Sequence, residues 1–318
     1  KPDYLVVDHV EPDHSGSIMA LVNKYPGIKL VGNTKTFAFL SQFFDGVSFD
    51  DIKVEVKEGD ELSLGSHTLT FMLAAMVHWP EVMVTFEKSE GLLFAADAFG
   101  KFGTIDTDED WACEARRYYF NIVGKYGLQV QGLLKKAAAL DIKKILPLHG
   151  PILTENLGYY IDKYNTWSTY TPEDKGITVA YASIHGNTRR AAEELAQMLN
   201  AKGAPKVSLF DLSRDDIAEA VEDAFRYDRL VLMAASYDAG VFPPMEYFLI
   251  KLKAKTYRNR TIAIVENGTW APSAGKVMKS YVENLKDITL IEPMVSILSS
   301  LNDRTRKQLE ELADKLTK

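Results

Sequence analysis

The sequence is poor in cysteine and has no long apolar run. Of its 318 residues one is cysteine, Cys113. A lone cysteine forms no disulfide within the chain, which is typical of the reducing cytoplasm, so we expect a cytoplasmic protein. It also excludes a cysteine-ligated iron–sulfur or rubredoxin-type centre built from this chain alone. No apolar run approaches the roughly 20 residues of a membrane-spanning helix, and we expect no membrane association.

Positive charge is also scarce. The 37 Lys and Arg residues are outnumbered by 44 Asp and Glu residues, which gives a formal net charge of −7. Such a chain repels nucleic acids and anionic lipid surfaces, so we expect neither as a partner. The sequence begins at Lys1-Pro2-Asp3 without Met or a signal-peptide pattern and enters an apolar strand almost at once. We therefore expect that an upstream part of its first domain is missing.

The length indicates two domains, because a single hydrophobic core usually stops growing near ~250 residues. Hydrophobic residues make up 46% and charged residues 25%, as in ordinary globular proteins. Turn-forming and charged residues cluster at 171–176, and the pattern of strands and helices changes there. We therefore predict one domain at 1–172 and a second at 173–318.

The first half alternates strands with helices and then shows two-residue alternation between Gly and Asp turns. This pattern predicts an α/β domain with much antiparallel sheet. The expected strands are 4–7, 29–31, 52–56, 61–64, 68–73, 82–86, 92–95 and 144–146, and the expected helices are 15–24, 36–44, 110–140 with an interruption at 124–127, and 154–167.

The second half alternates strands and helices regularly. This order predicts a doubly wound, parallel, five-stranded sheet with helices on both faces. The expected strands are 177–181, 206–211, 229–233, 261–265 and 288–291, and the expected helices are 187–201, 215–224, 244–253, 274–284 and 303–316.

Metal-ligating residue types are concentrated directly after the first strand. His9, Glu11 and Asp13 alternate along an extended loop, so their side chains can converge on one side, and His14 adds a second imidazole. A simpler interpretation is a polar strand-to-helix loop in which Asp13 or Ser15 caps the helix. A cap needs only one such side chain, so the whole set indicates a metal site.

Three further candidates lie where apolar strands or runs end. They are His78, His149 and Asp97, and strand ends are where a sheet can bring distant side chains together. His67 lacks this setting and is interpreted as a surface strand histidine. The predicted ligands are His9, Glu11 and His78 for one ion and Asp13, His14 and His149 for a second, with Asp97 bridging.

The ligand types indicate the metal. Nitrogen and oxygen donors suit iron or manganese, and zinc is left open. Zinc sites of this shape tend to be richer in nitrogen, so Glu11 favours iron.

A loop at 183–188 follows the first strand of the second half and precedes a helix. Backbone N–H groups and hydroxyls there point toward the positive end of the helix, which suits a terminal phosphate. Gly186 permits close backbone approach. The loop is neither a Walker loop nor a G-x-G-x-x-G dinucleotide loop. Taken alone, a polar helix cap explains it equally well.

Two more loops follow the third and fourth strands on the same side of the predicted sheet, where doubly wound folds bind ligands. Tyr237 and Trp270 offer flat apolar faces for an isoalloxazine ring, although surface packing explains each of them alone. Together the three loops resemble the FMN site of flavodoxins. The predicted flavin contacts are Ser183, Ile184, His185, Gly186, Asn187, Thr188, Ser236, Tyr237, Asp238, Ala239, Gly240, Asn267, Gly268, Thr269, Trp270 and Ala271.

The ligand order and its flanking strings, HVEPDHSGS, HWPE and DAFG, resemble the flavodiiron proteins over the whole chain. The resemblance implies a metallo-β-lactamase-like αβ/βα sandwich, N-terminally incomplete here, followed by a flavodoxin-like domain. It implies two iron ions on the seven predicted ligands and FMN in the second domain. One departure concerns the third flavin loop, where the family usually has a Gly-Trp pair and this chain has Thr269 before Trp270.

The same resemblance implies an oxidoreductase that reduces O2 to water, NO to N2O, or both. Electrons would come from an external donor such as rubredoxin or a flavin/NADH reductase. A head-to-tail homodimer or a dimer of dimers is expected, because the short segment at 170–176 gives one chain little freedom to join its own two sites. Two alternatives stay open. One is a zinc-dependent hydrolase of the metallo-β-lactamase type, and the other is an FMN electron carrier with an inactive metal domain.

Overall fold

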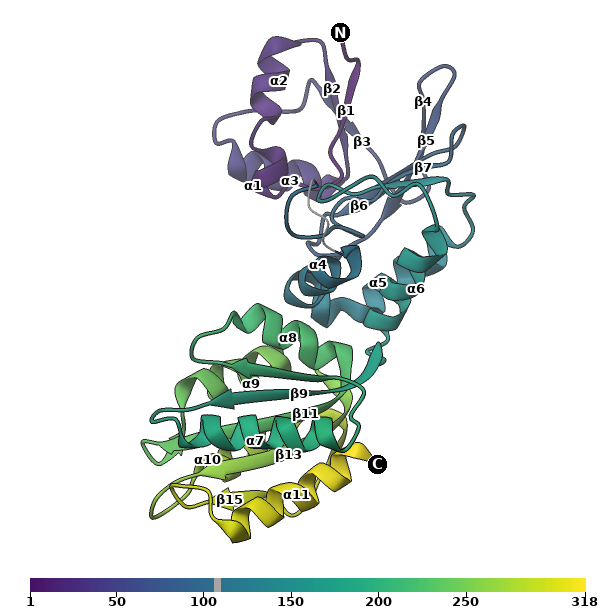
Figure 1. The fold of residues 1–318 in the computed structure, drawn as a ribbon. Coiled ribbons are helices and arrows are strands. Elements are labelled where there is room, and N and C mark those ends of the chain that lie inside the picture. Colours follow the sequence, from purple (N-terminus) through teal and green to yellow (C-terminus); the bar gives the residue numbers. More distant parts are fainter. Residues whose placement is uncertain (106–109) are drawn as a thin grey trace. The chain divides into compact units, whose positions relative to one another are not determined.

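A computed structural model describes residues 1–105 and 110–318 of the chain. The chain divides into two compact units, Lys1–Thr169 and Tyr170–Lys318, which are called the first and the second unit (Figure 1). Within the described residues, no helix is both long enough and apolar enough to cross a membrane.

The first unit contains two sheets that pack face to face. A parallel sheet has the order β1-β2-β3, and a five-stranded sheet has the order β4-β5-β6-β7-β8, antiparallel except for the β7–β8 pair. Val31 of the first sheet and Phe71 and Met83 of the second share one buried cluster, so apolar side chains from both sheets fill the space between them. The strands are β1 (Tyr4–Val6), β2 (Lys29–Gly32), β3 (Lys53–Glu55), β4 (Glu61–Ser63), β5 (Thr68–Leu73), β6 (Met83–Glu87), β7 (Leu92–Phe94) and β8 (Lys144–Leu146).

Helices cover the sheets of this unit. Ile18 of α2 and Phe37 and Leu40 of α3 pack with Leu30 of β2, which buries one face of the parallel sheet. The expected interruption of the long helix is present as a π-helical turn followed by a 3₁₀ turn. The expected helix at 15–24 begins later, at Ile18 of α2, and a separate short helix, α1, precedes it. The helices are α1 (Pro12–Ser15), α2 (Ile18–Lys24), α3 (Thr34–Phe43), α4 (Trp111–Tyr118), η1 (Tyr119–Val123), η2 (Gly124–Tyr126), α5 (Gly127–Ala137) and α6 (Leu157–Ser168).

The second unit is a doubly wound parallel sheet of order β10-β9-β11-β13-β14, which is the flavodoxin-like order. Two short strands share the fifth position: β14 pairs with residues 258–262 of β13, and β15 pairs with residues 265–267. Five positions were expected, but β15 was missed because it has only three residues. The strands are β9 (Asp174–Ala182), β10 (Val207–Asp211), β11 (Tyr227–Tyr237), β12 (Gly240–Val241), β13 (Arg258–Asn267), β14 (Lys286–Leu290) and β15 (Val295–Ile297).

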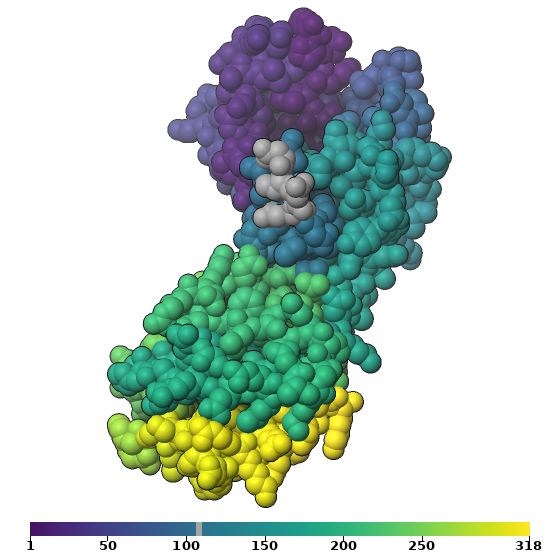
Figure 2. All heavy atoms as spheres, viewed as in Figure 1, coloured from purple at the N-terminus to yellow at the C-terminus, as the bar shows by residue number. Residues whose placement is uncertain are grey.

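Helices lie on both faces of this sheet. Side chains of α7 and α11 pack with Ile177, Val179 and Tyr181, alternate residues of β9 that point to one face. Figures 1 and 2 show α11 beside α7 on this face. The other three helices contact the sheet strands from the opposite face (Figure 1). The helices are α7 (Asn187–Ala201), α8 (Ile217–Arg226), α9 (Pro243–Ala254), α10 (Ala274–Val282) and α11 (Asp303–Thr317).

Candidate functional site

The loop after β1 presents its polar side chains without using them as helix caps. Pro12 is at the first helical position of α1, where its fixed φ is favourable, and this makes Glu11 the N-cap residue. The Glu11 side chain makes no capping bond. Ser15 Oγ instead donates to the carbonyl oxygen of Val10 at 2.8 Å. The capping interpretation of Asp13 or Ser15 is therefore wrong, and the loop carboxylates are free for another role.

A first cluster contains His9, Glu11, His78 and Asp97. Nε2 of His78 lies 3.1 Å from Glu11 Oε2 and 3.0 Å from Asp97 Oδ2. Nε2 of His9 lies 3.3 Å from Glu11 Oε2 and 3.6 Å from Asp97 Oδ2. One ligand atom from each of the four residues lies within 4.8 Å of the others. Donor atoms at such separations fit around one cation with bonds of about 2.0–2.2 Å.

A second cluster contains Asp13, His14 and His149. Oδ2 of Asp13 lies 3.4 Å from His14 Nε2 and 3.3 Å from His149 Nε2. Asp97 connects the two clusters, because its Oδ1 lies 3.1 Å from His14 Nε2 and 3.7 Å from His149 Nε2. Each oxygen of this carboxylate therefore faces a different cluster, which is the arrangement of a bridging ligand.

Asp97 is buried, and its charge is stabilised by its neighbours. Burial alone would raise the pKa of Asp97, but hydrogen bonds with His14, His78 and Tyr118 and the charge of His9 hold it far below the usual range. Asp97 is therefore ionised at neutral pH. Burial and the nearby Asp97 charge raise the pKa of Tyr118, so this hydroxyl keeps its proton and donates a hydrogen bond to Asp97 Oδ2 at 2.9 Å.

Sequence reasoning missed two residues that contact these clusters. Tyr118 lies in a helix and has no sequence signal. Glu81 lies three residues after His78 in the string HWPE, and its Oε1 lies 2.6 Å from His9 Nδ1. His67, interpreted as a surface residue, lies beside Glu87 at 3.1 Å and belongs to neither cluster.

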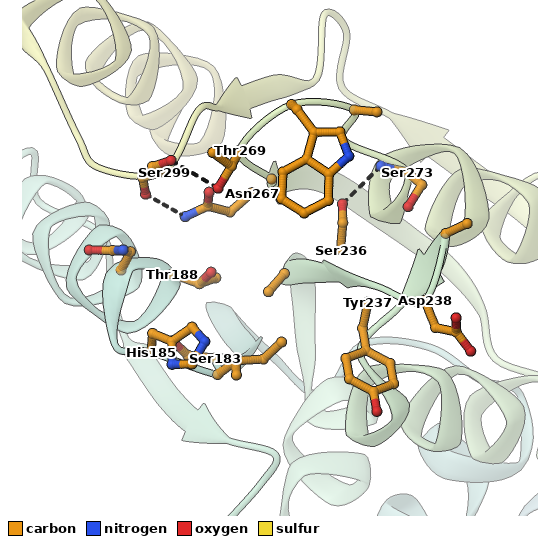
Figure 3. Close-up of a pocket in the computed structure, with 17 residues that line it drawn as sticks. Ser183, His185, Thr188, Ser236, Tyr237, Asp238, Asn267, Thr269, Ser273 and Ser299 are labelled. Atoms are coloured by element: carbon orange, nitrogen blue, oxygen red, sulfur yellow. Dashed lines mark hydrogen bonds between the residues drawn. The ribbon is translucent and has the colours of Figure 1, made fainter.

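The second unit has a cavity of about 650 Å³ at the carboxyl ends of β9, β11 and β13, a volume typical of cofactor sites (Figure 3). Of the expected flavin contacts, all except Gly186 and Gly240 line it, and Ala235, Ser273 and Ser299 are added. The lining residues are Ser183, Ile184, His185, Asn187, Thr188, Ala235, Ser236, Tyr237, Asp238, Ala239, Asn267, Gly268, Thr269, Trp270, Ala271, Ser273 and Ser299.

One wall of this cavity is the loop before α7. Ser183 Oγ accepts a hydrogen bond from the backbone N–H of Gly186 at 3.1 Å, which closes the loop. Gly186 has φ +86°, a conformation that glycine adopts without strain. Asn187 and Thr188, the first residues of α7, also line the cavity, and the start of a helix favours an anionic group.

In the opposite wall, hydroxyl and amide groups are joined by hydrogen bonds (Figure 3). Ser299 Oγ donates to Thr269 Oγ1 at 3.0 Å, and Asn267 Nδ2 donates to the carbonyl oxygen of Ser299 at 2.9 Å. Tyr237 and Trp270 are 51% and 90% exposed, so their ring faces are free to cover a planar group. Ser299 was missed because it follows β15, the strand that the sequence pattern did not reveal.

Comparisons with known proteins agree with a metal site in the first unit and a flavin site in the second. Residues 1–150 match the family described as ODP family beta lactamase. A nitric oxide reductase of Moorella thermoacetica is 28% identical over 302 residues, which cover 92% of this chain and 75% of that protein. An anaerobic nitric oxide reductase flavorubredoxin of Aliivibrio fischeri is 27% identical over 281 residues, which cover 84% of this chain and 56% of that protein.

Solved structures show the same fold over nearly the whole chain. Rubredoxin oxygen:oxidoreductase from Desulfovibrio gigas has a TM-score of 0.88 at 23% identity, and the match covers 99% of this chain and 80% of that one. The flavodiiron protein from Giardia intestinalis has a TM-score of 0.83 at 21% identity, and the match covers 99% and 79%. The chain belongs to the flavodiiron proteins.

Membership in the flavodiiron family confirms the expected fold class and the expected class of enzyme, an oxidoreductase. Flavodiiron proteins carry FMN and a di-iron site. The two sites described above fit this pair of groups, because one is a double cluster of nitrogen and oxygen ligands and the other is a cavity of cofactor size.

Proposed function

We propose that this flavodiiron protein reduces a diatomic gas, O2 to water or NO to N2O, with electrons that arrive through FMN. The observation that carries the proposal is the position of Asp97, whose two carboxylate oxygens each face a separate ligand cluster. A pair of metal ions held by one bridging carboxylate can bind a small molecule between them. Similarity to proteins named nitric oxide reductase and oxygen:oxidoreductase supports these two substrates.

In the first unit, His9, Glu11 and His78 would hold one iron ion and Asp13, His14 and His149 the other, with Asp97 bridging. Iron held by these residues would supply electrons to a bound gas, and FMN in the second unit would deliver them one at a time. The three carboxylate side chains of the clusters would offset most of the charge of two divalent ions as ligands. Tyr118 holds its proton at Asp97 Oδ2 and so fixes the orientation of the bridge.

In the second unit, the loop at 183–188 would bind the terminal phosphate of FMN. Tyr237 and Trp270 would cover the flavin ring, and backbone amides of the loops after β11 and β13 would hold its polar edge. Thr269, in place of the usual glycine, is fixed by its hydrogen bond with Ser299 and forms part of the wall.

The proposal extends to partners, location and domain limits. We infer domains at 1–172 and 173–318, and a head-to-tail homodimer or dimer of dimers in which FMN of one subunit serves the iron site of the other. Rubredoxin or a flavin/NADH reductase would supply the electrons. A single cysteine favours a reducing compartment, which makes the cytoplasm the proposed location.

Anaerobic purification with counting of iron and FMN, followed by reduction and separate pulses of O2 and NO, tests the function. The expected result is two iron ions and one FMN per chain, with oxidation of the flavin by at least one gas. Two zinc ions with no gas consumption would support the hydrolase alternative. FMN without bound metal would support the electron-carrier alternative.

A further inference from the structure

Glu81 is a fully buried carboxylate beside the first cluster. Its relative exposure is 0%, and it precedes the apolar residues Val82, Met83 and Val84, which are also buried. A buried carboxylate is unfavourable unless it is paired, and the packing of this apolar segment does not require a charge. Its conformation is fixed by two contacts outside the cluster. Asn33 Nδ2 donates to the Glu81 carbonyl oxygen at 2.6 Å, and the Val10 N–H donates to Glu81 Oε1 at 3.1 Å.

The same Glu81 oxygen, Oε1, faces Nδ1 of His9, the ring nitrogen that points away from the cluster. Oε1 lies 2.6 Å from His9 Nδ1, while His9 Nε2 lies 3.3 Å from Glu11 Oε2 and 3.6 Å from Asp97 Oδ2. At 2.6 Å, Glu81 Oε1 is placed to accept a hydrogen bond from His9 Nδ1–H, which keeps the imidazole proton on that nitrogen. Nε2 then presents its lone pair to the cluster, and the hydrogen bond at Nδ1 makes it a stronger donor.

This arrangement distinguishes His9 from the other histidines of the clusters. All four cluster histidines, including His9, direct Nε2 toward the carboxylates. Of these four histidines, His9 is the one whose Nδ1 also contacts a carboxylate among residues 1–105 and 110–318. The other oxygen of Glu81, Oε2, is buried without a hydrogen-bond partner among these residues, so the carboxylate is directed toward His9 rather than toward a wider network.

We propose that Glu81 is a positioning residue for iron in the cluster of His9, Glu11, His78 and Asp97. It fixes the ring orientation and tautomer of His9 and thereby strengthens binding of that iron and lowers its reduction potential. The inference rests on the proposed function, in that it takes iron as the ion. Removal of such a carboxylate from behind a metal-bound histidine typically costs about 10–100-fold in metal affinity.

The test is Glu81→Gln in the full chain, since glutamine keeps the size and one acceptor oxygen but removes the charge. Fe(II) alone is titrated anaerobically into metal-free protein, and the potential of the iron centre is measured by mediated redox titration. We expect one of the two iron ions to bind about 10–100-fold more weakly and the potential to become more positive. FMN content and circular dichroism report whether the variant folds.

Glu87→Gln is the matched control. Glu87 is also buried, ends β6, and lies 3.1 Å from Nδ1 of a histidine, His67, that belongs to neither cluster. The same loss of charge there should leave iron affinity and potential unchanged. An equal change in both variants would overturn the assignment, because the effect would then be a general one of buried charge in this sheet.

The outcomes also separate the inference from the function on which it rests. A wild-type chain that binds no iron contradicts both. A wild-type chain with two iron ions and a folded Glu81→Gln variant of equal affinity and potential contradicts only the role of Glu81. If Glu81→Gln does not fold, ¹⁵N-histidine NMR of the zinc-loaded wild type decides. His9 should then carry an exchange-protected Nδ1–H, and a His9 without that proton would overturn the proposal.

Discussion

The hydroxyl of Tyr118 donates a 2.9 Å hydrogen bond to Oδ2 of Asp97, the carboxylate that faces both ligand clusters. This bond connects helix α4 to residues that follow strand β7, so the bridging position is fixed by two elements of the first unit. The geometry of the site therefore depends on residues outside the seven expected ligands, and each of these contacts can be changed separately.

Substitution Asp97→Asn should remove the bridge. An amide is a weak ligand, and its NH2 group cannot bind a cation, so one of the two faces of the bridge is lost. We expect loss of at least one iron ion per chain and a fall of about 100-fold or more in gas reduction, with FMN retained. Metal analysis measures the iron content, flavin absorbance measures the FMN content, and gas consumption measures the activity. Asp141→Asn, at an exposed side chain paired with Lys143, is the control and should keep wild-type iron content.

Substitution Tyr118→Phe tests the hydrogen bond itself. The ring is kept, but buried, ionised Asp97 loses a donor, which should lower the free energy of unfolding of the first unit by about 1.5–3 kcal/mol. Iron should also be released at lower chelator concentration. Denaturant unfolding of the metal-free protein and chelator titration measure the two effects. Tyr164→Phe removes another buried hydroxyl, which accepts from the Phe99 N–H, and should leave iron release unchanged.

Much of the metal site was predictable because its residues are chemically unusual and lie where strands end. A loop that combines His9, Glu11, Asp13 and His14 is rare unless it binds a metal. Glu81 could not be found in this way, since a single glutamate beside an apolar strand is common on protein surfaces. Its role depends on the direction of a buried side chain, and that direction follows from packing between sheet and loop rather than from local sequence.

In the flavin cavity, too, some lining residues could be predicted from the sequence and others could not. The loops after β9, β11 and β13 were predictable, because long apolar strands with clear ends reveal them. The contribution of Ser299 was not, because β15 is three residues long and is ordered by pairing with the far half of β13. The expected helix start at residue 15 was wrong for a local reason, since Pro12 begins a separate short helix, α1, and makes Glu11 its N-cap.

Substitution Gly186→Ala should weaken FMN binding. At φ +86° a side chain costs about 1–2 kcal/mol, and relief of that strain would rotate the loop that closes on Ser183. We expect the FMN dissociation constant to rise about 5–30-fold, as measured by flavin fluorescence. Gly203→Ala is the control, because Gly203 has φ +81° beyond the other end of α7. It should destabilise the second unit similarly without changing FMN affinity.

Acid should weaken the first unit partly through Glu87. Hydrogen bonds from the Ser89 hydroxyl and the backbone N–H groups of Ser89 and Glu90, together with His67, lower the pKa of Glu87 from 4.5 to about 2 despite its burial. A lowered folded-state pKa stabilises the fold above about pH 4.5, and this contribution is lost as the pH falls toward 2. Glu87→Gln should therefore be less stable than wild type at pH 7, and the difference should shrink below pH 4.5. Urea unfolding of the metal-free protein at several pH values measures it, and a difference that is constant from pH 7 to pH 3 would contradict the assignment.

Mixing two inactive chains tests whether electrons cross between subunits. Asp97→Asn lacks the bridge, and Gly186→Val, with a β-branched residue at positive φ, should lack FMN. In a head-to-tail dimer, a mixed pair has one intact FMN opposite one intact iron site. After dissociation and reassociation of equal amounts, about half of the dimers are mixed. Each mixed dimer has one working pair of FMN and iron site, where a wild-type dimer has two. About a quarter of wild-type activity should therefore return. Each variant reassociated alone should stay inactive. A mixture that also stays inactive, although native mass spectrometry shows mixed dimers, would mean that electrons pass within one chain.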